Sequence, residues 1–313
     1  MKKLDLKDKK LLAELDLNSR ATLAGLARRI PVSKQVVDYR LKNLVKNKII
    51  SQFYAVINFS KLGYTQHKLY FKFQNADVEK EREIVAYWAK SRNAIWVASC
   101  RGRWDLAVSL LAKDSNELGA LLSAFLEKYG ALVLEKDALI TQTSHVFTKG
   151  SKEKKRFVYG SGLGHYALDE IDQKILRMLS TQARVSILEM MAALNLTRDV
   201  IAYRMKKLVK EEIISQFRVL ANMGHRLYKI MLRLHSLTPE KERQLVTYVA
   251  LHPDGVQYLK LIGSWDAEVE FEVRDDEHLH EILLGMRNTF SGLIRDYDLL
   301  FIHEEHKLNY YPF

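Results

Sequence analysis

The sequence has very little cysteine and lacks long runs of apolar residues. Its 313 residues include a single cysteine, Cys100, so an intrachain disulfide and a zinc site built from several cysteines are excluded. No apolar run approaches the roughly 18 residues that a membrane-spanning helix needs, and the first ten residues are rich in charge. These features predict a cytoplasmic protein that is neither secreted nor inserted into a membrane.

Positive charge is abundant and unevenly distributed. Lys and Arg total 49 against 38 Asp and Glu, which gives a formal net charge of +11. Residues 1–60 contain 13 Lys and Arg and 5 Asp and Glu, a net charge of +8, whereas residues 167–222 contain 9 and 7, a net charge of +2. A basic protein favours a polyanionic partner such as nucleic acid. The positive field is concentrated in the first 60 residues.

The chain contains an internal repeat. Residues 46–53 (KNKIISQF) recur as residues 210–217 (KEEIISQF), a shift of 164 positions from Phe53 to Phe217. Further along the chain the shift becomes 161 positions, from Trp104 to Trp265. The first shift also aligns Asp5 with Asp169, Asp8 with Asp172, Arg20 with Arg184, Tyr39 with Tyr203 and Arg40 with Arg204. We therefore expect a duplication that covers nearly the whole chain.

Each copy begins with a pattern of three helices. Apolar residues have helical spacing in residues 8–17 and again in residues 22–30. A tight connection then leads to Ser33, which is placed to cap a third helix running to about residue 46; Thr197 has this position in the second copy. Residues 49–57 are β-branched and aromatic, which predicts a small hairpin. Three helices and such a ribbon describe a winged helix-turn-helix.

The rest of each copy alternates strands and helices in the order βαββαβ. In the first copy the expected elements are 68–74, 78–90, 94–100, 104–112, 115–129 and 132–145, and in the second copy they are 229–235, 239–251, 256–262, 266–273, 276–289 and 293–306. This order is the ferredoxin-like pattern. The predicted fold class is α+β, with two copies of a winged helix-turn-helix followed by a ferredoxin-like domain.

Domain boundaries follow from this pattern. We expect winged helix-turn-helix domains at 1–60 and 166–224 and ferredoxin-like domains for effector binding and dimerisation at 61–148 and 225–313. Residues 149–165 (KGSKEKKRFVYGSGLGH) lie between the copies and are rich in glycine and basic residues, which is typical of a flexible linker. Its basic stretch could act as a solubilising connector or could contact phosphate.

Several short motifs occur in the same order in both copies, with Leu196-Thr197 in the place of Val32-Ser33 in the second copy. They are Leu4-Asp5-x-x-Asp8-x-x-x-Leu12, Arg20, Val32-Ser33, Arg40-x-x-x-Leu44, Ile49-Ile50 and Gly102-x-Trp104-Asp105. Together they resemble the Lrp/AsnC family of transcription regulators. The resemblance implies a DNA-binding head joined to a dimerising domain that senses an effector, often an amino acid. This chain has Lys48 and Glu212 where the family commonly has glycine.

The third helix of each copy is expected to enter the major groove of DNA. Val36, Leu41 and Leu44 should pack inward. The residues predicted to contact DNA are Ser33, Lys34, Gln35, Asp38, Tyr39, Arg40 and Lys42, and in the second copy Thr197, Arg198, Asp199, Ala202, Tyr203, Arg204 and Lys206. Gln35 could pair with adenine, Lys34 or Arg198 with guanine, and Asp199 with cytosine.

Alternatives remain open for these residues. Both helix faces could be merely solvated, or could dock a protein. Arg40 and Arg204 could bind phosphate or could brace the fold through a carboxylate. Tyr39 and Tyr203 could reach a phosphate or cover the core with their rings.

The Gly-x-Trp-Asp loops are the predicted effector-binding residues: Gly102, Arg103, Trp104, Asp105, Gly263, Ser264, Trp265 and Asp266. Glycine lets the backbone approach a ligand closely. The carboxylates could hold an ammonium group, and the Trp side chains could line a pocket. The alternative is a structural turn whose Trp fills the core.

No motif predicts an enzyme. A nucleophile with its base and a phosphate-binding glycine loop are both missing from the sequence. His303-Glu304-Glu305-His306 does not predict a metal site, because strand positions three apart point to opposite faces. No catalytic residue, metal or cofactor is expected.

The favoured function is sequence-specific regulation of transcription in response to a small molecule such as an amino acid. The expected partners are double-stranded DNA and a small-molecule effector, and no membrane is expected. The two copies are expected to form an internal pseudo-dimer, and further homo-oligomers remain possible. One alternative is a tandem enzyme like the sirohaem decarboxylases, which have the same architecture but carry Tyr-Asn-Leu-Trp where this chain has Arg103-Trp104-Asp105-Leu106. Another is an effector-binding adaptor that does not contact DNA.

Overall fold

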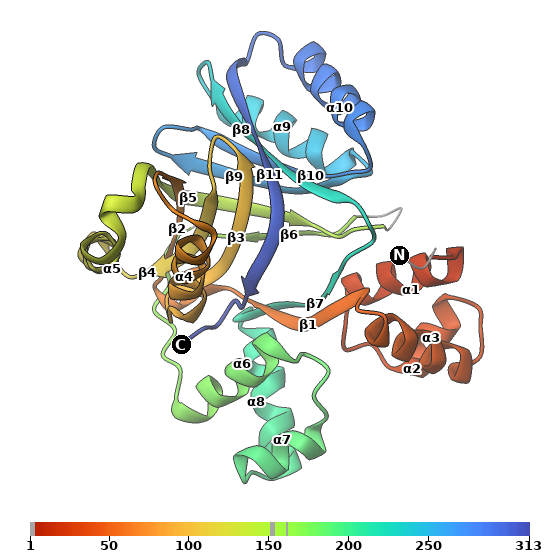
Figure 1. The fold of residues 1–313 in the computed structure, drawn as a ribbon. Coiled ribbons are helices and arrows are strands. Elements are labelled where there is room, and N and C mark those ends of the chain that lie inside the picture. The colour runs from red at the N-terminus through yellow and green to blue at the C-terminus, as the bar shows by residue number, and fades with distance from the viewer. Residues whose placement is uncertain (1–3, 151–153, 161) are drawn as a thin grey trace. The chain divides into compact units, whose positions relative to one another are not determined.

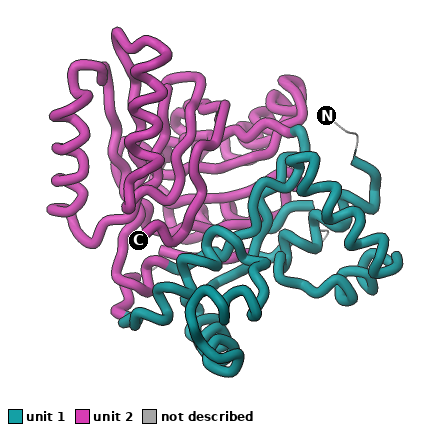
Figure 2. The backbone as a smooth tube through the Cα atoms, turned by 60° about the horizontal axis from the view of Figure 1, so that its bottom comes forward, with its two compact units in different colours: residues 1–58, 148–155, 166–224 teal, residues 59–147, 156–165, 225–313 magenta. Residues whose placement is uncertain are grey.

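The computed structural model describes residues 4–150, 154–160 and 162–313. It divides into two compact units (Figure 2). Unit 1 comprises residues 1–58, 148–155 and 166–224, and unit 2 comprises residues 59–147, 156–165 and 225–313. Each unit thus combines the corresponding parts of both copies.

Unit 1 contains the two three-helix heads. Its elements are α1 (Leu6–Leu17), α2 (Leu23–Arg29), α3 (Lys34–Lys46), β1 (Ile50–Ile57), α6 (Glu170–Thr181), α7 (Ile187–Leu194), α8 (Arg198–Lys210) and β7 (Ile214–Ala221). Polar side chains cap the helix starts: Asp5 forms a capping box with Asp8 at α1, and Ser33 and Thr197 cap α3 and α8.

The predicted hairpin at residues 49–57 is wrong. These residues form the single strand β1, which pairs antiparallel with β7 of the other copy (Figure 1). Tyr54 lies opposite Arg218 in this ladder. The stretch from Ile50 to Ile57 contains no Gly, Pro, Asn or Asp at which a hairpin could reverse. The backbone N–H and C=O groups along one edge of β1 therefore pair with the equivalent strand of the second copy.

Each head also packs against the strand of the other head. Helix α1 packs against β7, and α6 packs against β1. The core of the first head consists of Leu11, Leu15, Leu26, Val37 and neighbouring apolar residues, and it includes Val219 from the second copy. The heads are therefore two halves of one folded body.

Unit 2 contains both βαββαβ patterns. Its elements are η1 (Phe59–Leu62), β2 (Thr65–Phe73), α4 (Val78–Lys90), β3 (Ala94–Gly102), β4 (Leu106–Ala112), α5 (Ser115–Tyr129), η2 (Gly130–Leu132), β5 (Val133–Phe147), β6 (Arg156–Tyr159), β8 (Arg226–Leu234), α9 (Pro239–Leu251), β9 (Gly255–Ile262), β10 (Ala267–Val273), α10 (Asp276–Thr289) and β11 (Ile294–Leu308). The predicted α+β fold class is confirmed.

The strands of unit 2 form one closed sheet. Their order is β2-β4-β3-β11-β8-β10-β9-β5-β6, and β2 also pairs with β5, which completes the ring. The two ferredoxin-like sheets join edge to edge twice, at β3–β11 and at β5–β9. Closure leaves these edges paired within the chain. Apolar cores lie under α4 and α5 and under α9 and α10, and a third core fills the space between the sheets.

Part of the predicted linker is a strand. Residues 156–159 form β6 and pair with β5, with His145 opposite Val158. Tyr159 is buried and its ring contacts Phe59 at a centroid distance of 5.3 Å. These contacts come from distant segments, so the local glycine and lysine content did not indicate them. Residues 151–153 and 161 of the predicted linker lie outside the described residues.

Among the helices in the described part of the chain, none has the length and apolar character needed to cross a membrane.

Candidate nucleic-acid interface

Helix α3 presents one face to the core and the other to solvent. Val37, Leu41 and Leu44 are buried. The prediction that Val36 packs inward is wrong, because this side chain is 38% exposed. Positions 37, 41 and 44 share one helix face at spacings of four and three, whereas position 36 falls outside that face. Val36 therefore joins the outer surface.

The outer face of α3 carries most of the residues predicted to contact DNA. Lys34, Gln35, Tyr39 and Lys42 are exposed, and Tyr39 is 68% exposed and so does not cover the core. Asp38 is half-buried and pairs with Lys42 at 2.7 Å across one helical turn. Surface pairs of this kind are weak, so Lys42 can exchange Asp38 for another anion.

Helix α8 repeats this arrangement with different side chains. Ile201 and Leu208 are buried. The exposed face carries Arg198, Asp199, Val200, Ala202, Tyr203 and Lys206. The structure thus places the variable positions of the two copies at equivalent sites on two exposed helix faces.

Arg40 and Arg204 lie in ion pairs with the starts of other helices. Arg40 Nη1 lies 2.7 Å from Asp8 Oδ1 and 2.8 Å from Asp5 Oδ2. Hydrogen bonds to Asp8 and then Asp5 raise the pKa of Arg40 above its ordinary value. Arg204 contacts Asp169 and Asp172 in the same way. The geometry supports the bracing role for both arginines.

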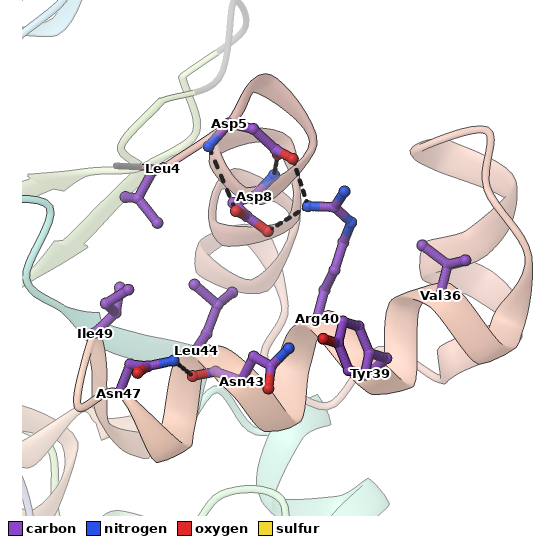
Figure 3. A pocket seen from close by; sticks show the side chains of 10 residues that line it. All are labelled: Leu4, Asp5, Asp8, Val36, Tyr39, Arg40, Asn43, Leu44, Asn47 and Ile49. Carbon is purple, nitrogen blue, oxygen red and sulfur yellow. Dashed lines mark hydrogen bonds and ion pairs between the residues drawn. The ribbon is translucent and has the colours of Figure 1, made fainter. Parts of the chain in front are cut away.

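A pocket of about 440 Å³ lies beside α3 (Figure 3). Its lining residues are Leu4, Asp5, Asp8, Val36, Tyr39, Arg40, Asn43, Leu44, Asn47 and Ile49. Arg40 points from α3 toward the two aspartates at the start of α1 (Figure 3). Together these three groups have a net charge of −1, so this pocket is a poor site for a phosphate. Lys34 and Lys42, exposed cationic side chains of α3, are not among the residues that line this pocket.

The turns after α3 and α8 have an unusual backbone. Lys48 and Glu212 both have φ +56°, in the left-handed region that favours glycine. Their amides bond the carbonyl oxygens of Val45 and Val209, each at 3.0 Å, and so end the helices. Lys48 and Glu212, which stand where the resemblance led us to expect glycine, therefore adopt a backbone conformation that favours glycine.

The Gly-x-Trp-Asp loops are turns with buried tryptophans. Gly102 and Gly263 have φ +124° and +146°, and a Cβ atom on Gly102 would lie 2.6 Å from the Leu299 carbonyl oxygen. Trp104 and Trp265 are each 2% exposed and belong to the core between the sheets. Neither indole is available to line an open ligand pocket in this conformation.

The aspartates of these loops accept hydrogen bonds from backbone amides. Asp105 accepts hydrogen bonds from the Phe73 amide and the Lys72 ammonium group, both at 2.8 Å. Asp266 accepts one from the Leu234 amide at 2.7 Å. The geometry therefore supports the structural turn more than an ammonium-binding site.

The second residue of each loop lies at the surface and contacts β5. Arg103 pairs with Glu135 at 2.6 Å, and this hydrogen bond raises the pKa of Arg103. Ser264 donates to Asp137. The loops of both copies thus attach to a strand of the first copy, and their role toward an effector stays a prediction.

Known proteins resemble the chain in both heads and over a length of about one copy. A family model described as winged helix-turn-helix DNA-binding matches residues 4–51 and 168–215. An uncharacterized HTH-type transcriptional regulator of Pyrococcus abyssi is 30% identical over 136 residues, 41% of this chain and 85% of that protein. An HTH-type transcriptional regulator of Mycobacterium tuberculosis is 26% identical over 122 residues, 39% of this chain and 82% of that protein. Each relative therefore corresponds to about one copy.

A solved structure resembles nearly the whole chain. The siroheme decarboxylase NirDL matches 97% of this chain and 93% of its own, with a TM-score of 0.66 and 13% sequence identity. At this identity the likeness concerns the fold alone.

The heads and the relatives together define a winged helix-turn-helix transcription regulator. The chain belongs to the family of HTH-type regulators that includes the Pyrococcus protein. The resemblance to Lrp/AsnC regulators is confirmed, with the unit of that family present twice in tandem.

Proposed function

We propose that the chain regulates transcription by binding double-stranded DNA in a sequence-specific manner through α3 and α8. The observation that carries this proposal is the pair of exposed, capped helix faces with hydrogen-bonding side chains at equivalent positions. In helix-turn-helix proteins the early residues of such a helix contact base edges in the major groove. Lys34, Gln35, Arg198 and Asp199 occupy the first turn of their helices.

The two helices should prefer different bases. Lys34, Gln35 and Asp38 in α3 are replaced by Arg198, Asp199 and Ala202 in α8. Gln pairs well with adenine, Arg with guanine and Asp with cytosine. Because the heads share their scaffold but differ at these positions, the preferred operator is asymmetric, with two unlike half-sites.

Selection from a random pool of DNA duplexes tests this function. The expected result is enrichment of one asymmetric sequence. Gln35→Asp should then shift the preferred base in one half-site, and Asp199→Gln should shift it in the other. Leu188→Ser changes an exposed residue of α7 outside both recognition helices and is the matched control. Enrichment of no sequence, or of a palindrome, would contradict the proposal.

An amino-acid effector is proposed on the family resemblance, and its site is open. The buried Trp104 and Trp265 and the backbone bonds of Asp105 and Asp266 support a turn at the predicted loops. Thermal denaturation with each of the twenty amino acids tests for an effector, since a ligand that binds the native state raises the melting temperature. A ligand that acts on the loops should lose this effect in Ser264→Ala.

The second candidate function is tetrapyrrole chemistry, which the fold likeness to the siroheme decarboxylase NirDL favours. The likeness is one of fold, which many unrelated functions can share. A visible absorption spectrum after addition of a haem-like tetrapyrrole distinguishes the two candidates. We expect no shift of the pigment bands on mixing, and a saturable shift would support the enzyme.

A further inference from the structure

The two copies have symmetric backbones but an asymmetric set of buried charges. In the interior of unit 2, Lys229 Nζ lies 2.7 Å from Glu268 Oε1 and also bonds Glu270. Lys68 Nζ lies 3.5 Å from the same Glu268 oxygen, and the Tyr70 hydroxyl donates to Glu268 Oε2 at 2.5 Å. None of the four charged residues is more than 5% exposed.

These charges depend on one another. Both ammonium groups lie over the Trp96 ring, Lys68 at 5.2 Å and Lys229 at 4.7 Å from its centroid. Burial alone would raise the pKa of Glu268, but Lys229 and Lys68 outweigh it and hold the pKa below its ordinary value. Burial lowers the pKa of Lys68 despite its neighbouring carboxylates. A lysine here without a carboxylate would be strongly destabilising.

The lysines come from both copies, but the carboxylates come from one. The shift of 161 relates Lys68 to Lys229, whereas it relates Glu268 and Glu270 to Ala107 and Ser109. A first copy paired with a second copy therefore buries two lysines and two glutamates. Two first copies would bury two lysines with no carboxylate at these positions, and two second copies would bury two lysines with four glutamates.

Unit 1 has an independent example of the same asymmetry. Arg218 donates from Nε and Nη2 to the two oxygens of Asp16 at 2.9 and 2.7 Å, and both side chains are 5% exposed. The shift of 164 relates this pair to Tyr54 and Ser180, which carry no charge at neutral pH. The Lys149 amide also donates to Asp16 at 2.7 Å.

From these two charge sets we infer that the copies pair only as unlike partners. The surfaces that the first copy presents in both units fit the second copy and reject another first copy, and the reverse also holds. When two chains of this protein meet, like copies therefore do not assemble. The inference does not depend on DNA binding, but it implies that the two heads of one folded body always carry different recognition helices.

Disulfides to the native Cys100 can report both kinds of pair. Cys100 lies opposite Ile302 in the β3–β11 ladder, and the equivalent pair in the β5–β9 ladder is Leu261 with Thr141. In a pair of two first copies, Cys100 of one chain would lie opposite Thr141 of the other. Ile302→Cys therefore reports unlike pairs, and Thr141→Cys reports like pairs.

The test uses the full chain, refolded from urea under oxidising conditions at several hundred micromolar, as a mixture of isotope-labelled and unlabelled molecules. High concentration matters because tethered copies meet at an effective concentration on the order of millimolar. We expect Ile302→Cys to give a 100–302 link and Thr141→Cys to give no link between chains. A 100–141 link between labelled and unlabelled chains would overturn the inference.

A chain without the asymmetry is the matched comparison. Methionine replaces Lys68, Lys229, Glu268 and Glu270, and Asp16→Ser with Arg218→Tyr copies the uncharged pair of the other copy. Apolar replacement of buried ion clusters is often tolerated. In this background Thr141→Cys should give 100–141 links between chains. A separate Ile302→Cys variant in the same background shows by its 100–302 link that the chain folds. If the folded chain gives no such link, the charges do not select the partner and the inference is wrong.

A second variant decides the matter if that chain fails to fold. Ala107→Glu, Ser109→Glu, Glu268→Ala and Glu270→Ser together transplant the carboxylates to the first copy. We expect its urea midpoint to exceed that of Glu268→Ala with Glu270→Ser, which leaves the lysines without these carboxylates. Tryptophan fluorescence reports the transition, because all four tryptophans lie in unit 2. Equal midpoints would overturn the inference.

Discussion

Arg20 and Arg184 make reciprocal contacts across the two heads of unit 1. Arg20 Nη1 donates to the carbonyl oxygens of Ala183 at 2.5 Å and Val185 at 3.0 Å. Arg184 Nη1 donates to the equivalent carbonyl oxygens, those of Ser19 and Ala21, at 2.5 and 3.2 Å. Each arginine thus binds the backbone of the segment that connects the first two helices of the opposite head.

This reciprocity predicts similar losses of stability when either arginine is removed. Arg20→Ala or Arg184→Ala leaves two carbonyl oxygens without a charged donor, and such hydrogen bonds contribute roughly 1.5–3 kcal/mol each. We expect each variant to lose about 3–6 kcal/mol, measured by far-UV circular dichroism in urea. Arg29→Ala is the control, because its ion pair with Glu14 is at the surface and its side chain is 55% exposed. It should lose less than about 1 kcal/mol. A large loss for only one of the two half-buried arginines would contradict the symmetry.

The ion pair of Asp16 and Arg218 predicts a strongly non-additive mutant cycle. Asp16→Ser or Arg218→Tyr alone leaves a buried charge without its partner, which costs about 3–5 kcal/mol. The double variant contains the uncharged pair that the chain already has at Ser180 and Tyr54. It should therefore regain most of the loss. Urea unfolding of the four chains gives the coupling energy, and additive losses would show that the pair is not coupled.

Much of the fold could be predicted from the sequence because its signals are local. Strand and helix order in the ferredoxin-like domains follows from periodicity within 8 to 15 residues. The pairing of β1 with β7 could not be predicted this way, since it depends on a partner 164 positions away. The inward residue of α3 is Val37 and not the neighbouring Val36, and the spacing of four and three from Val37 to Leu41 and Leu44 is the sequence signal that distinguishes the two valines.

The candidate site shows the same limit. Exposure of Lys34, Gln35 and Tyr39 follows from helix geometry, but the partners of Arg40 and Asp105 depend on contacts across the fold. The buried charges at Asp16, Lys68 and Glu268 had no local signal at all. A comparison of the aligned copies could have found Asp16 and Glu268, since the uncharged Ser180 and Ala107 stand at the equivalent positions.

Lys48 and Glu212 predict a gain of stability on substitution by glycine. Both have φ +56°, a conformation that costs a non-glycine residue roughly 1–2 kcal/mol. The greater chain entropy of glycine in the unfolded state offsets part of this, so Lys48→Gly and Glu212→Gly should each gain about 0.5–1 kcal/mol. Thermal unfolding measures the gain. Lys46→Gly, at the last residue of α3, should instead lose stability.

The uneven charge of the heads predicts unequal contributions to DNA affinity. Residues 1–60 have a net charge of +8 and residues 167–222 have +2. Lys34→Ala with Lys42→Ala should therefore weaken binding more than Arg198→Ala with Lys206→Ala. Each lost phosphate contact reduces the slope of log affinity against log salt by about 0.9. Titrations at several salt concentrations on the selected duplex measure this slope, and equal losses for the two pairs would contradict the expectation.

Val36 and Val200 predict that the two half-sites share a thymine. Both valines are exposed, 38% and 36%, on the first turn of their helices, between positions that differ between the copies. The C5-methyl of thymine is the apolar group that the major groove presents. Burying one such group contributes about 0.8 kcal/mol, so replacing that thymine with uracil should weaken binding about fourfold per half-site.

The same duplexes supply the control for this thymine contact. Val36→Ala should make binding insensitive to uracil in the half-site that α3 reads, while the other half-site keeps its full sensitivity. Val200→Ala should show the opposite pattern, because the two contacts are made by separate helices to separate bases. If each valine variant instead lost the same affinity on the thymine duplex as on the uracil duplex, the valines would stabilise the helix surface and would not contact the base.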